Sequence, residues 1–439
     1  MAVLLTTGLA LNMLLLQYYY SPGPKQLISD EDYYFNFALA ASRGEQPADN
    51  PLRPPLYAEF LTVLFAAFGP SVLPAQLLQI CLWFFTGLLV WRIAQLVTGS
   101  ASVALTALAL YEVSPDLSAF SHYLWPETLH LFLWILALWL LMQFPGSVRA
   151  AGASGIALGL ALLTKSALLP FIPVLGLFVL LGPGSEFPAR IRVARAMLLV
   201  LATFLTVLPA MLGNSRGRGQ LMINESSVFN VWVGLNDRST ADSSDNEIVG
   251  MEIRNYLAYE PKAARTTHYL GLIAEKLRDQ GIRRTLWSQL SRQYFRLFDI
   301  RTFFTTQLPG AGRESYAPRP GWQVALLQGF SHVTYGITLA AGSAGLALIE
   351  FRKRTWAVLL GLFVGYNVLA FFLLHAVTRY VIQILPFLMI LASVTLHALS
   401  ARKRAGPIAA NGFRSTPSRA LLAGAAALTM VFVMTYNLM

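Results

Sequence analysis

Residues 27–44 read LISDEDYYFNFALAASRG and carry the densest acidic cluster of a mostly apolar chain. Ser29 and Asp32 have the spacing of an approximate capping box, and Gly44 supplies a left-handed stop. The stretch therefore predicts a short helix over about residues 30 to 43. We interpret the rest of the chain around this helix.

The first turn of the predicted helix would contain Asp30 and Glu31, where free N–H groups and the helix dipole favour ionised carboxylates. Such carboxylates suit a general base or a metal ligand. The alternative interpretation is structural, because acidic residues are common at helix N-termini for these same reasons. One face of the helix would pack against a membrane or protein surface, and it consists of Tyr34, Phe37, Ala38 and Ala41.

The composition is that of a polytopic membrane protein. The 439 residues are 55% hydrophobic and only 13% charged, with a mean hydropathy of +0.54. A single cysteine, Cys81, excludes an intramolecular disulfide and indicates nothing about the compartment.

Hydropathy predicts an all-α fold with about eleven membrane spans. The expected spans are residues 3–17, 72–97, 101–117, 122–143, 150–164, 167–182, 194–213, 322–349, 355–374, 377–398 and 420–437. A short apolar helix near 55–69 is expected to be interfacial or re-entrant, like the acidic helix before it. We divide the chain into an N-terminal transmembrane module (1–213, with the first outer loop at 21–71), a large loop (214–320) and a C-terminal transmembrane module (321–439). The large loop shows weak periodicity and one plausible amphipathic helix near 263–281.

The distribution of charge predicts the orientation. One set of inter-span loops carries thirteen basic residues against two acidic ones, Glu186 and Glu350, which equals the whole net charge of +11. By the positive-inside rule these loops are cytoplasmic, and the basic balance indicates topology, not a nucleic-acid partner. The acidic helix and the large loop then lie on the opposite face. The basic residues are Arg92, Arg149, Arg190, Arg192, Arg195, Arg352, Lys353, Arg354, Arg402, Lys403, Arg404, Arg414 and Arg419.

Several ionisable residues are predicted to gather at outer helix ends. Glu127 follows Pro126 at the start of a span, Lys165 lies between two spans, and Arg379 begins another. Lys165 and Arg379 could snorkel to an interface, but a chain that concentrates its unbalanced cations inside favours anion binding at this face. Arg53 is a weaker third candidate. The six histidines are interpreted as structural.

Carboxylates and phosphate-binding cations on one outer surface are typical of transfer from a lipid-linked phosphate donor. A hydroxyl acceptor needs a base near its proton, and a phosphate leaving group needs cations where charge develops. A polyprenyl-phosphate sugar supplies such a donor without ATP.

Several ordered motifs carry a resemblance to a known family. Residues 30–34 (DEDYY) match a D-E-x-x-Y pattern, residues 54–57 read PPLY, Pro115 precedes Glu127, and Lys165 lies in a T-K segment. Two further elements are the stretch with Asn230, Trp232, Gly234 and Asn236, and Arg379-Tyr380 with Pro386. In this order they resemble the GT-C integral-membrane glycosyltransferases, and among them family 39, which contains protein O-mannosyltransferases and lipid A aminoarabinose transferases.

The resemblance implies a GT-C bundle and an inverting glycosyl transfer at the outer leaflet. Its implied catalytic residues are Asp30, with Glu31 assisting, and Glu127, and whether Asp30 or Glu31 is the base stays open. Its implied donor-phosphate contacts are Lys165 and Arg379, to which we add Arg53, the weaker candidate above, and Tyr380. The expected substrate-loop residues are Tyr34, Tyr57, Asn230 and Asn236. Two departures leave the acceptor open: many relatives have Asp in place of Glu127, and the chain has no room for the soluble C-terminal domain of the lipid A transferases.

The expected enzyme moves a hexose or pentose from a polyprenyl-phosphate donor to a hydroxyl of an envelope protein, lipid or glycan. It would lie in a bacterial inner membrane, with its site on the periplasmic or extracellular side. A transporter or flippase of a lipid-linked sugar is the alternative from another class, although the chain shows no internal repeat. No cofactor or metal is required, and a divalent ion held by Asp30 and Glu127 is a minor alternative.

Overall fold

The computed structural model describes residues 1–21, 23–182, 187–236, 247–311, 315–351, 355–372, 374–404 and 417–436. These residues are largely helical and contain no β-strand, which confirms the predicted all-α class. Some residues used to predict orientation lie outside this description, namely Glu186, Arg352, Lys353, Arg354 and Arg414, with the side chains of Arg402, Lys403 and Arg404.

The first half of the chain contains the predicted surface helices and several apolar ones. The acidic helix α2 ends one residue before the predicted end, and Gly44 has the expected positive φ of 75°. The order is α1 (Ala2–Tyr20), α2 (Asp30–Ser42), α3 (Leu56–Phe68), α4 (Val72–Thr98), α5 (Ala101–Glu112), α6 (Pro115–Ser118), η1 (Ala119–His122), α7 (Glu127–Gln143), α8 (Val148–Thr164), η2 (Ser166–Phe171), α9 (Ile172–Leu181) and α10 (Ala189–Arg218).

The second half begins with the large loop. Its order is α11 (Ser226–Asn236), α12 (Glu247–Ala258), α13 (Lys262–Gln280), α14 (Ile282–Ser288), η3 (Gln289–Gln293), η4 (Tyr294–Phe298), α15 (Phe303–Gln307), α16 (Gly321–Leu348), α17 (Thr355–Ala370), η6 (Thr378–Gln383), α18 (Leu385–Arg404) and α19 (Pro417–Thr435).

The predicted capping contact of α2 is wrong. Ser29 has φ 53° and ψ −121°, and its side chain makes no capping hydrogen bond. The N–H of Glu31 is satisfied by the carbonyl of Ile28 at 3.1 Å. The first turn is therefore closed by the backbone, and the acidic side chains are free to point toward other elements.

Prolines break several of the predicted spans. The span expected over 101–117 stops at Glu112, and that expected over 122–143 starts at Glu127. The segment Pro115–His122 and α7 are bent by 119°. Pro115 and Pro126 disfavour the helical conformation of the residues before them, so the chain cannot continue straight. The break brings the Leu124 N–H to 2.8 Å from the Glu31 carboxylate.

Two further spans begin with 3₁₀ turns. Residues 377–398 divide into η6 and α18, with Pro386 near the start of α18, and residues 167–182 divide into η2 and α9, with Pro170 inside η2. Because proline lacks an N–H, it weakens the α-helical pattern at each point. Arg379 lies on η6, and Lys165 immediately precedes η2.

The chain is an integral membrane protein, and the number of spans stays a prediction. Among the described residues, four helices are long and apolar enough to cross a membrane, α1, α4, α10 and α19, and the bent pair would make a fifth. Six shorter apolar helices have 10–17 residues. A hydropathy window counts such short or broken helices as spans, whereas a criterion on the length of each single helix does not.

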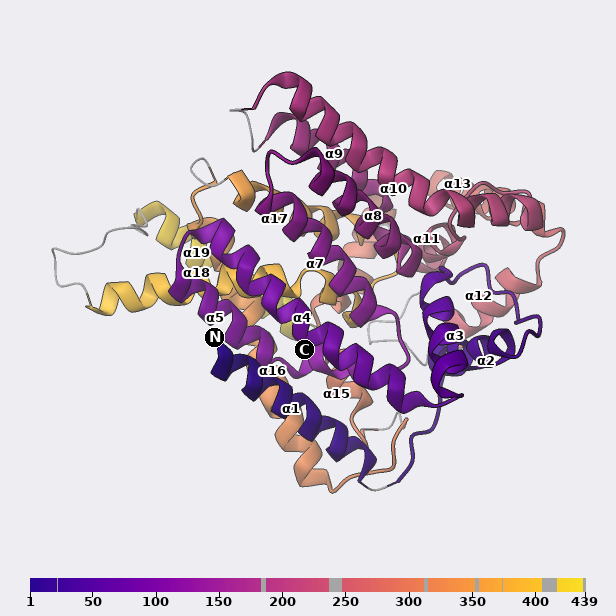
Figure 1. Cartoon of the computed structure of the whole chain (residues 1–439), viewed down its shortest axis with the longest axis horizontal. Coiled ribbons are helices and arrows are strands. Elements are labelled where there is room, and N and C mark those ends of the chain that lie inside the picture. Colours follow the sequence, from indigo (N-terminus) through magenta and orange to yellow (C-terminus); the bar gives the residue numbers. More distant parts are fainter. Residues whose placement is uncertain are drawn as a thin grey trace.

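The large loop is more helical than its sequence predicts. The expected amphipathic helix is present as α13, and α11, α12, α14 and α15 accompany it. A small apolar cluster of the loop contains Phe229, Val233, Tyr256 and Tyr269, and Leu52 of the first outer loop packs into it. In Figure 1, α11, α12 and α13 lie at the same end of the molecule as α2 and α3.

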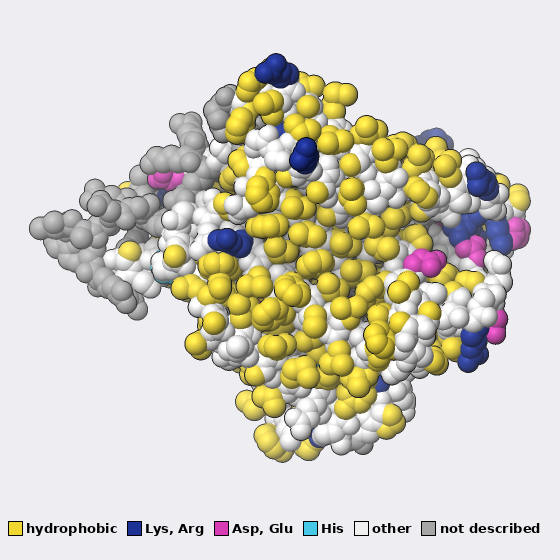
Figure 2. All heavy atoms as spheres, in the orientation of Figure 1, with side chains coloured by type: hydrophobic (Ala, Val, Ile, Leu, Met, Phe, Trp, Pro, Cys, Tyr) yellow, Lys and Arg dark blue, Asp and Glu magenta, His cyan; other side chains and the backbone are white. Residues whose placement is uncertain are grey.

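The apolar bundle is held by close helix packing. A Cβ on Gly155 of α8 would lie 2.4 Å from the Leu199 carbonyl oxygen of α10, and one on Gly345 of α16 would lie 2.2 Å from that of Leu391 of α18. Small residues let these backbones approach each other. Figure 2 shows a broad apolar face over the centre of the molecule, whereas acidic and basic side chains gather at the end that carries α2, α12 and α13.

Candidate active site

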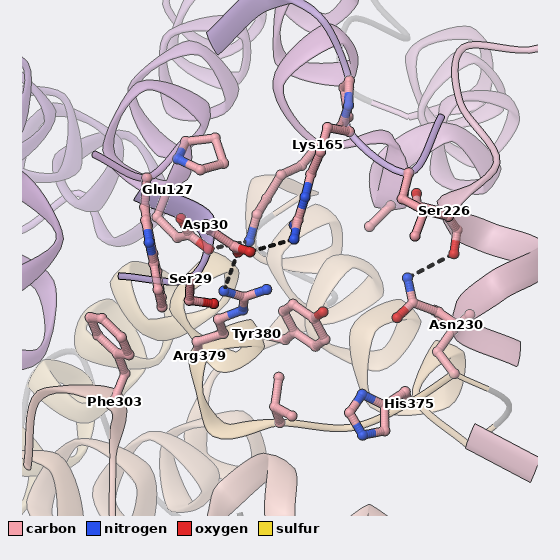
Figure 3. A pocket seen from close by; sticks show the side chains of 18 of the residues that line it. Ser29, Asp30, Glu127, Lys165, Ser226, Asn230, Phe303, His375, Arg379 and Tyr380 are labelled. Atoms are coloured by element: carbon pink, nitrogen blue, oxygen red, sulfur yellow. Dashed lines mark hydrogen bonds and ion pairs between the residues drawn. The ribbon is translucent and has the colours of Figure 1, made fainter. Parts of the chain in front are cut away.

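A cavity of about 530 Å³ lies between the N-terminus of α2, the broken α6–α7 segment, η2, α11 and η6. Figure 3 shows charged side chains from these separate elements pointing toward one another in it. Its lining contains Asp30, Tyr34, Arg53, Trp125, Glu127, Lys165, Ser166, Ser226, Asn230, Phe303, Gln307, His375, Arg379 and Tyr380, with apolar residues between them.

Asp30 is held between two arginines. Its Oδ1 forms an ion pair with Arg53, and its Oδ2 accepts a hydrogen bond from Arg379 Nη1 at 3.0 Å. Burial raises the pKa of the Asp30 carboxyl, but the charges of Arg53, Arg379 and Lys165 outweigh this effect, so the pKa lies below the ordinary value of 3.8. Asp30 is therefore ionised at neutral pH.

A second ion pair stands beside the first. Lys165 Nζ lies 2.7 Å from Glu127 Oε1, and both side chains are largely buried. The other oxygen of Glu127, Oε2, is buried and has no hydrogen-bond partner. Buried polar atoms are normally satisfied, so an unsatisfied carboxylate oxygen at a cavity wall is suited to contact a ligand.

Aromatic rings fix the Arg379 guanidinium. Its carbon lies 4.7 Å from the Trp125 ring centre and 5.4 Å from that of Tyr380, and the Tyr380 ring stacks on Phe371 at 5.4 Å. Cation–π contacts hold the planar fork in one orientation.

The structure brings together eight of the residues predicted from sequence. Seven of those that line the cavity are Asp30, Tyr34, Arg53, Glu127, Lys165, Arg379 and Tyr380. Asn230 also lines it, and its amide donates to the Ser226 carbonyl at 2.7 Å. These residues are spread from position 30 to position 380, so only the fold makes them neighbours.

Three predicted residues lie away from the cavity. Glu31 points to Lys25, the Tyr57 hydroxyl donates to Gln79 at 2.9 Å, and the Asn236 side chain bonds within the large loop to Trp232. Glu31 and Tyr57 are fully buried. The structure therefore places Glu31 and Tyr57 behind the cavity wall, not at its surface.

Some lining residues were not predicted. Trp125 precedes the Pro126-Glu127 pair, and its only sequence signal was that neighbourhood. His375 was interpreted as structural, but it lines the cavity, and its backbone N–H donates to Asn230 at 2.9 Å. Ser226 opens α11 within a loop whose periodicity is too weak to place it.

The cavity suits an anion better than a divalent cation. Both oxygens of Asp30 face arginines, and Lys165 already pairs with Glu127. The part of the chain that the structure describes contains no group of three or more His, Cys, Asp or Glu side chains that could hold a metal. Three cations that converge beside two carboxylates provide the donors that a phosphate group would need.

Comparison with known proteins supports the resemblance seen in the motifs. Residues 52–209 match the model of a family described as dolichyl-phosphate-mannose-protein mannosyltransferase. No curated protein matches the chain.

Among solved structures, the chain is similar in fold to an archaeal oligosaccharyltransferase. The chain resembles the crystal structure of the Archaeoglobus fulgidus oligosaccharyltransferase in its apo form, with a TM-score of 0.51 and 15% identity, over 99% of this chain and 55% of the archaeal one. A second structure of that enzyme, tethered to an acceptor peptide, gives a TM-score of 0.50 and 11% identity, over 99% of this chain and 54% of the other. This chain thus spans little more than half the length of the archaeal enzyme. ArnT from Cupriavidus metallidurans in the apo state superposes loosely, with a TM-score of 0.40 and 13% identity, over 98% and 87% of the two chains.

Proposed function

We propose that this protein is an inverting glycosyltransferase that uses a polyprenyl-phosphate sugar as donor and a hydroxyl group as acceptor. The main observation in support is that the side chains of five charged residues converge on one cavity, namely Asp30, Arg53, Glu127, Lys165 and Arg379. The match of residues 52–209 to a lipid-phosphate-dependent mannosyltransferase family supports the same class of donor.

The charges of the site suit a monophosphate donor. Three cations face two carboxylates, Asp30 and Glu127, which leaves one unit of positive charge. A sugar phosphodiester carries one negative charge and neutralises it. A diphosphate-linked donor carries more negative charge and would leave the cavity unbalanced.

The donor phosphate and Asp30 would compete for the same arginines. When the phosphate draws Arg53 and Arg379 toward itself, Asp30 loses ion-pair partners and becomes a stronger base. The acceptor O–H gives its proton to Asp30 while its oxygen attacks the anomeric carbon, and the bond from that carbon to the phosphate oxygen breaks. One displacement inverts the configuration, and the leaving phosphate gains the electron pair and is stabilised by Arg and Lys.

We place this reaction at the non-cytoplasmic face of a bacterial inner membrane. The one-sided basic loops support that orientation, because they put α2 and the large loop outside. The acceptor is then an envelope protein, lipid or glycan. The donor assay described next would identify whether the transferred sugar is a hexose or a pentose.

The test is transfer by the purified protein in lipid nanodiscs. Radiolabelled polyprenyl-phosphate sugars are incubated with it and with envelope fractions, and labelled products are separated from the donor. We expect transfer with at least one donor, and loss of transfer in Asp30→Asn. A flippase would move the donor between leaflets of vesicles without releasing polyprenyl phosphate, so that result would favour the alternative.

A further inference from the structure

Behind the cavity wall lies a buried ion pair that the reaction itself does not use. Lys25 Nζ is 2.8 Å from Glu31 Oε1, and the two side chains are 1% and 0% exposed. The ammonium group also lies between two aromatic rings, 4.2 Å from the centre of Tyr123 and 4.1 Å from that of Tyr316. Each cation–π contact stabilises a charge that has lost its water.

The Glu31 carboxylate joins three segments of the chain. Oε1 accepts the Leu124 N–H at 2.8 Å, and Oε2 accepts the Ser315 hydroxyl at 2.8 Å. The segment before the helix is tied to the same place, because the Gln26 N–H donates to the Ser315 carbonyl at 2.7 Å. Glu31 therefore links α2 to the turn before α7 and to the end of the large loop.

The surrounding groups make this anchor rigid. The Tyr316 hydroxyl donates to the His122 carbonyl at 2.7 Å, and the Gln76 amide of α4 donates to both. The Tyr19 ring of α1 stacks on Tyr316 with centres 4.6 Å apart. Burial lowers the pKa of Lys25 to about 8, while Glu31 opposes this effect, so Lys25 is mostly protonated at neutral pH.

Each anchored position is next to a residue of the cavity. Glu31 is adjacent to Asp30, and Leu124 is adjacent to Trp125, which covers Arg379 and is two residues before Glu127. The bond from Leu124 to Glu31 thus holds the backbone that carries one cavity carboxylate against the backbone that carries the other.

We propose that Lys25 and Glu31 are positioning residues that clamp the α2 N-terminus to the turn before α7, and thereby hold Asp30 and Glu127 in register across the cavity. This role rests on the proposed glycosyl transfer. It also assigns to Glu31, the second acidic residue of the DEDYY motif, an anchoring role instead of a share in the chemistry.

A double-mutant cycle tests the clamp. Lys25→Met removes the cation and leaves a buried carboxylate unpaired, and Glu31→Gln does the reverse while keeping the shape and the Leu124 contact. The double variant leaves a neutral, satisfied site. Since a displacement of about 1 Å can cost about 10²-fold in rate, we expect each single variant to lower kcat by about that factor. We expect the double variant to recover to within about tenfold of the wild type.

A measurement of donor binding distinguishes a positioning role of Lys25 and Glu31 from a role in holding the donor. The cavity cations are untouched in all three variants, so the dissociation constant for polyprenyl phosphate should change by less than about threefold. Asp32→Asn is the matched control, because Asp32 is exposed on the same first turn and its carboxylate accepts a hydrogen bond from the Asn36 side chain. It should retain wild-type kcat.

Amide hydrogen exchange measures how firmly the start of α2 is held, and it does not depend on sugar transfer. Amides of residues 27–36 should exchange faster in both single variants and return to wild-type protection in the double variant. Full activity in both single variants would overturn the proposal. So would a loss of activity in Glu31→Gln that is not relieved when Lys25→Met is added, because Glu31 would then take part in the reaction directly. If exchange follows the cycle but no variant nor the wild type transfers sugar, the clamp stands as an anchor and the proposed function fails.

Discussion

At the scale of single residues, the proposed chemistry depends on Asp30. Asp30→Asn keeps the shape of the side chain and an oxygen for the arginines, so folding and donor binding should survive. The base is lost, and general-base catalysis is typically worth about 10²–10⁴ in rate. We expect kcat to fall by about that factor in a purified transfer assay, with Asp32→Asn unchanged. Wild-type turnover in Asp30→Asn would remove it as the base.

Arg379 is expected to recognise the donor phosphate through its planar fork. Arg379→Lys keeps the charge but loses the second donor and the stacking between Trp125 and Tyr380. A charged hydrogen bond contributes about 1.5–3 kcal/mol, so we expect binding of polyprenyl phosphate to weaken about tenfold or more. Equilibrium binding of the labelled lipid measures this. Arg43→Lys, at the exposed C-terminal end of α2, is the control, and equal affinity in both variants would contradict the phosphate role.

The pH dependence should differ between the free and the donor-bound enzyme. In the free protein the pKa of Asp30 is below 3.8, so its ionisation stabilises the fold above that pH and the contribution is lost as pH falls through the folded-state pKa. The profile of kcat/KM should therefore show no acid limb from Asp30 above about pH 4. In the bound complex the phosphate shares the arginines, and the acid limb of kcat should move to higher pH. An acid limb at higher pH in kcat/KM than in kcat would contradict this exchange of partners.

At the scale of elements, the cavity depends on helices that approach closely. Gly345→Ala would place a Cβ against the Leu391 backbone of α18, which cannot yield like a flexible side chain. Overpacking of this kind costs about 1–3 kcal/mol, so the apparent Tm in detergent should fall by several degrees. Gly336→Ala in the same helix meets no atom within 4 Å and is the matched control. Equal melting temperatures for the two variants would show that α16 and α18 are not packed as described.

The predicted helix bounds differ from the structure where local breaks or distant packing determine the elements. The predicted spans over 101–117 and 122–143 are interrupted because Pro115 and Pro126 bend the chain, and this bend carries Glu127 into the cavity. A hydropathy window averages over such breaks. The short helices α11, α12, α14 and α15 were not predicted, because a few turns are stable only when their apolar faces find partners.

At the scale of the whole molecule, the orientation can be tested by labelling. In a Cys81→Ser background, Asp279→Cys reports on the large loop, and Arg190→Cys reports on a basic loop; both positions are exposed. A membrane-impermeant maleimide added to intact cells should modify position 279 and reach position 190 only after lysis. The reverse pattern would put the cavity on the cytoplasmic side and remove the argument for a lipid-linked donor.

The sequence by itself determined that the chain is a helical membrane protein, and it indicated most of the charged residues that line the cavity. Apolar runs and a short acidic helix with Gly44 at its end are local signals, because hydropathy and backbone preference act within a few residues. Ordered motifs also pointed to Asp30, Arg53, Glu127, Lys165 and Arg379, since ionisable groups at membrane depth are costly and therefore conspicuous.

Only the tertiary structure decided which of these side chains face one another. The sequence could not tell Asp30 from Glu31, because the two are adjacent and chemically alike. Their side chains leave the helix in different directions, Asp30 to Arg53 and Arg379, and Glu31 to Lys25. Those partners lie at separations of up to 349 positions along the chain. Direction and distant contact are properties of the packed bundle, and no local pattern encodes them.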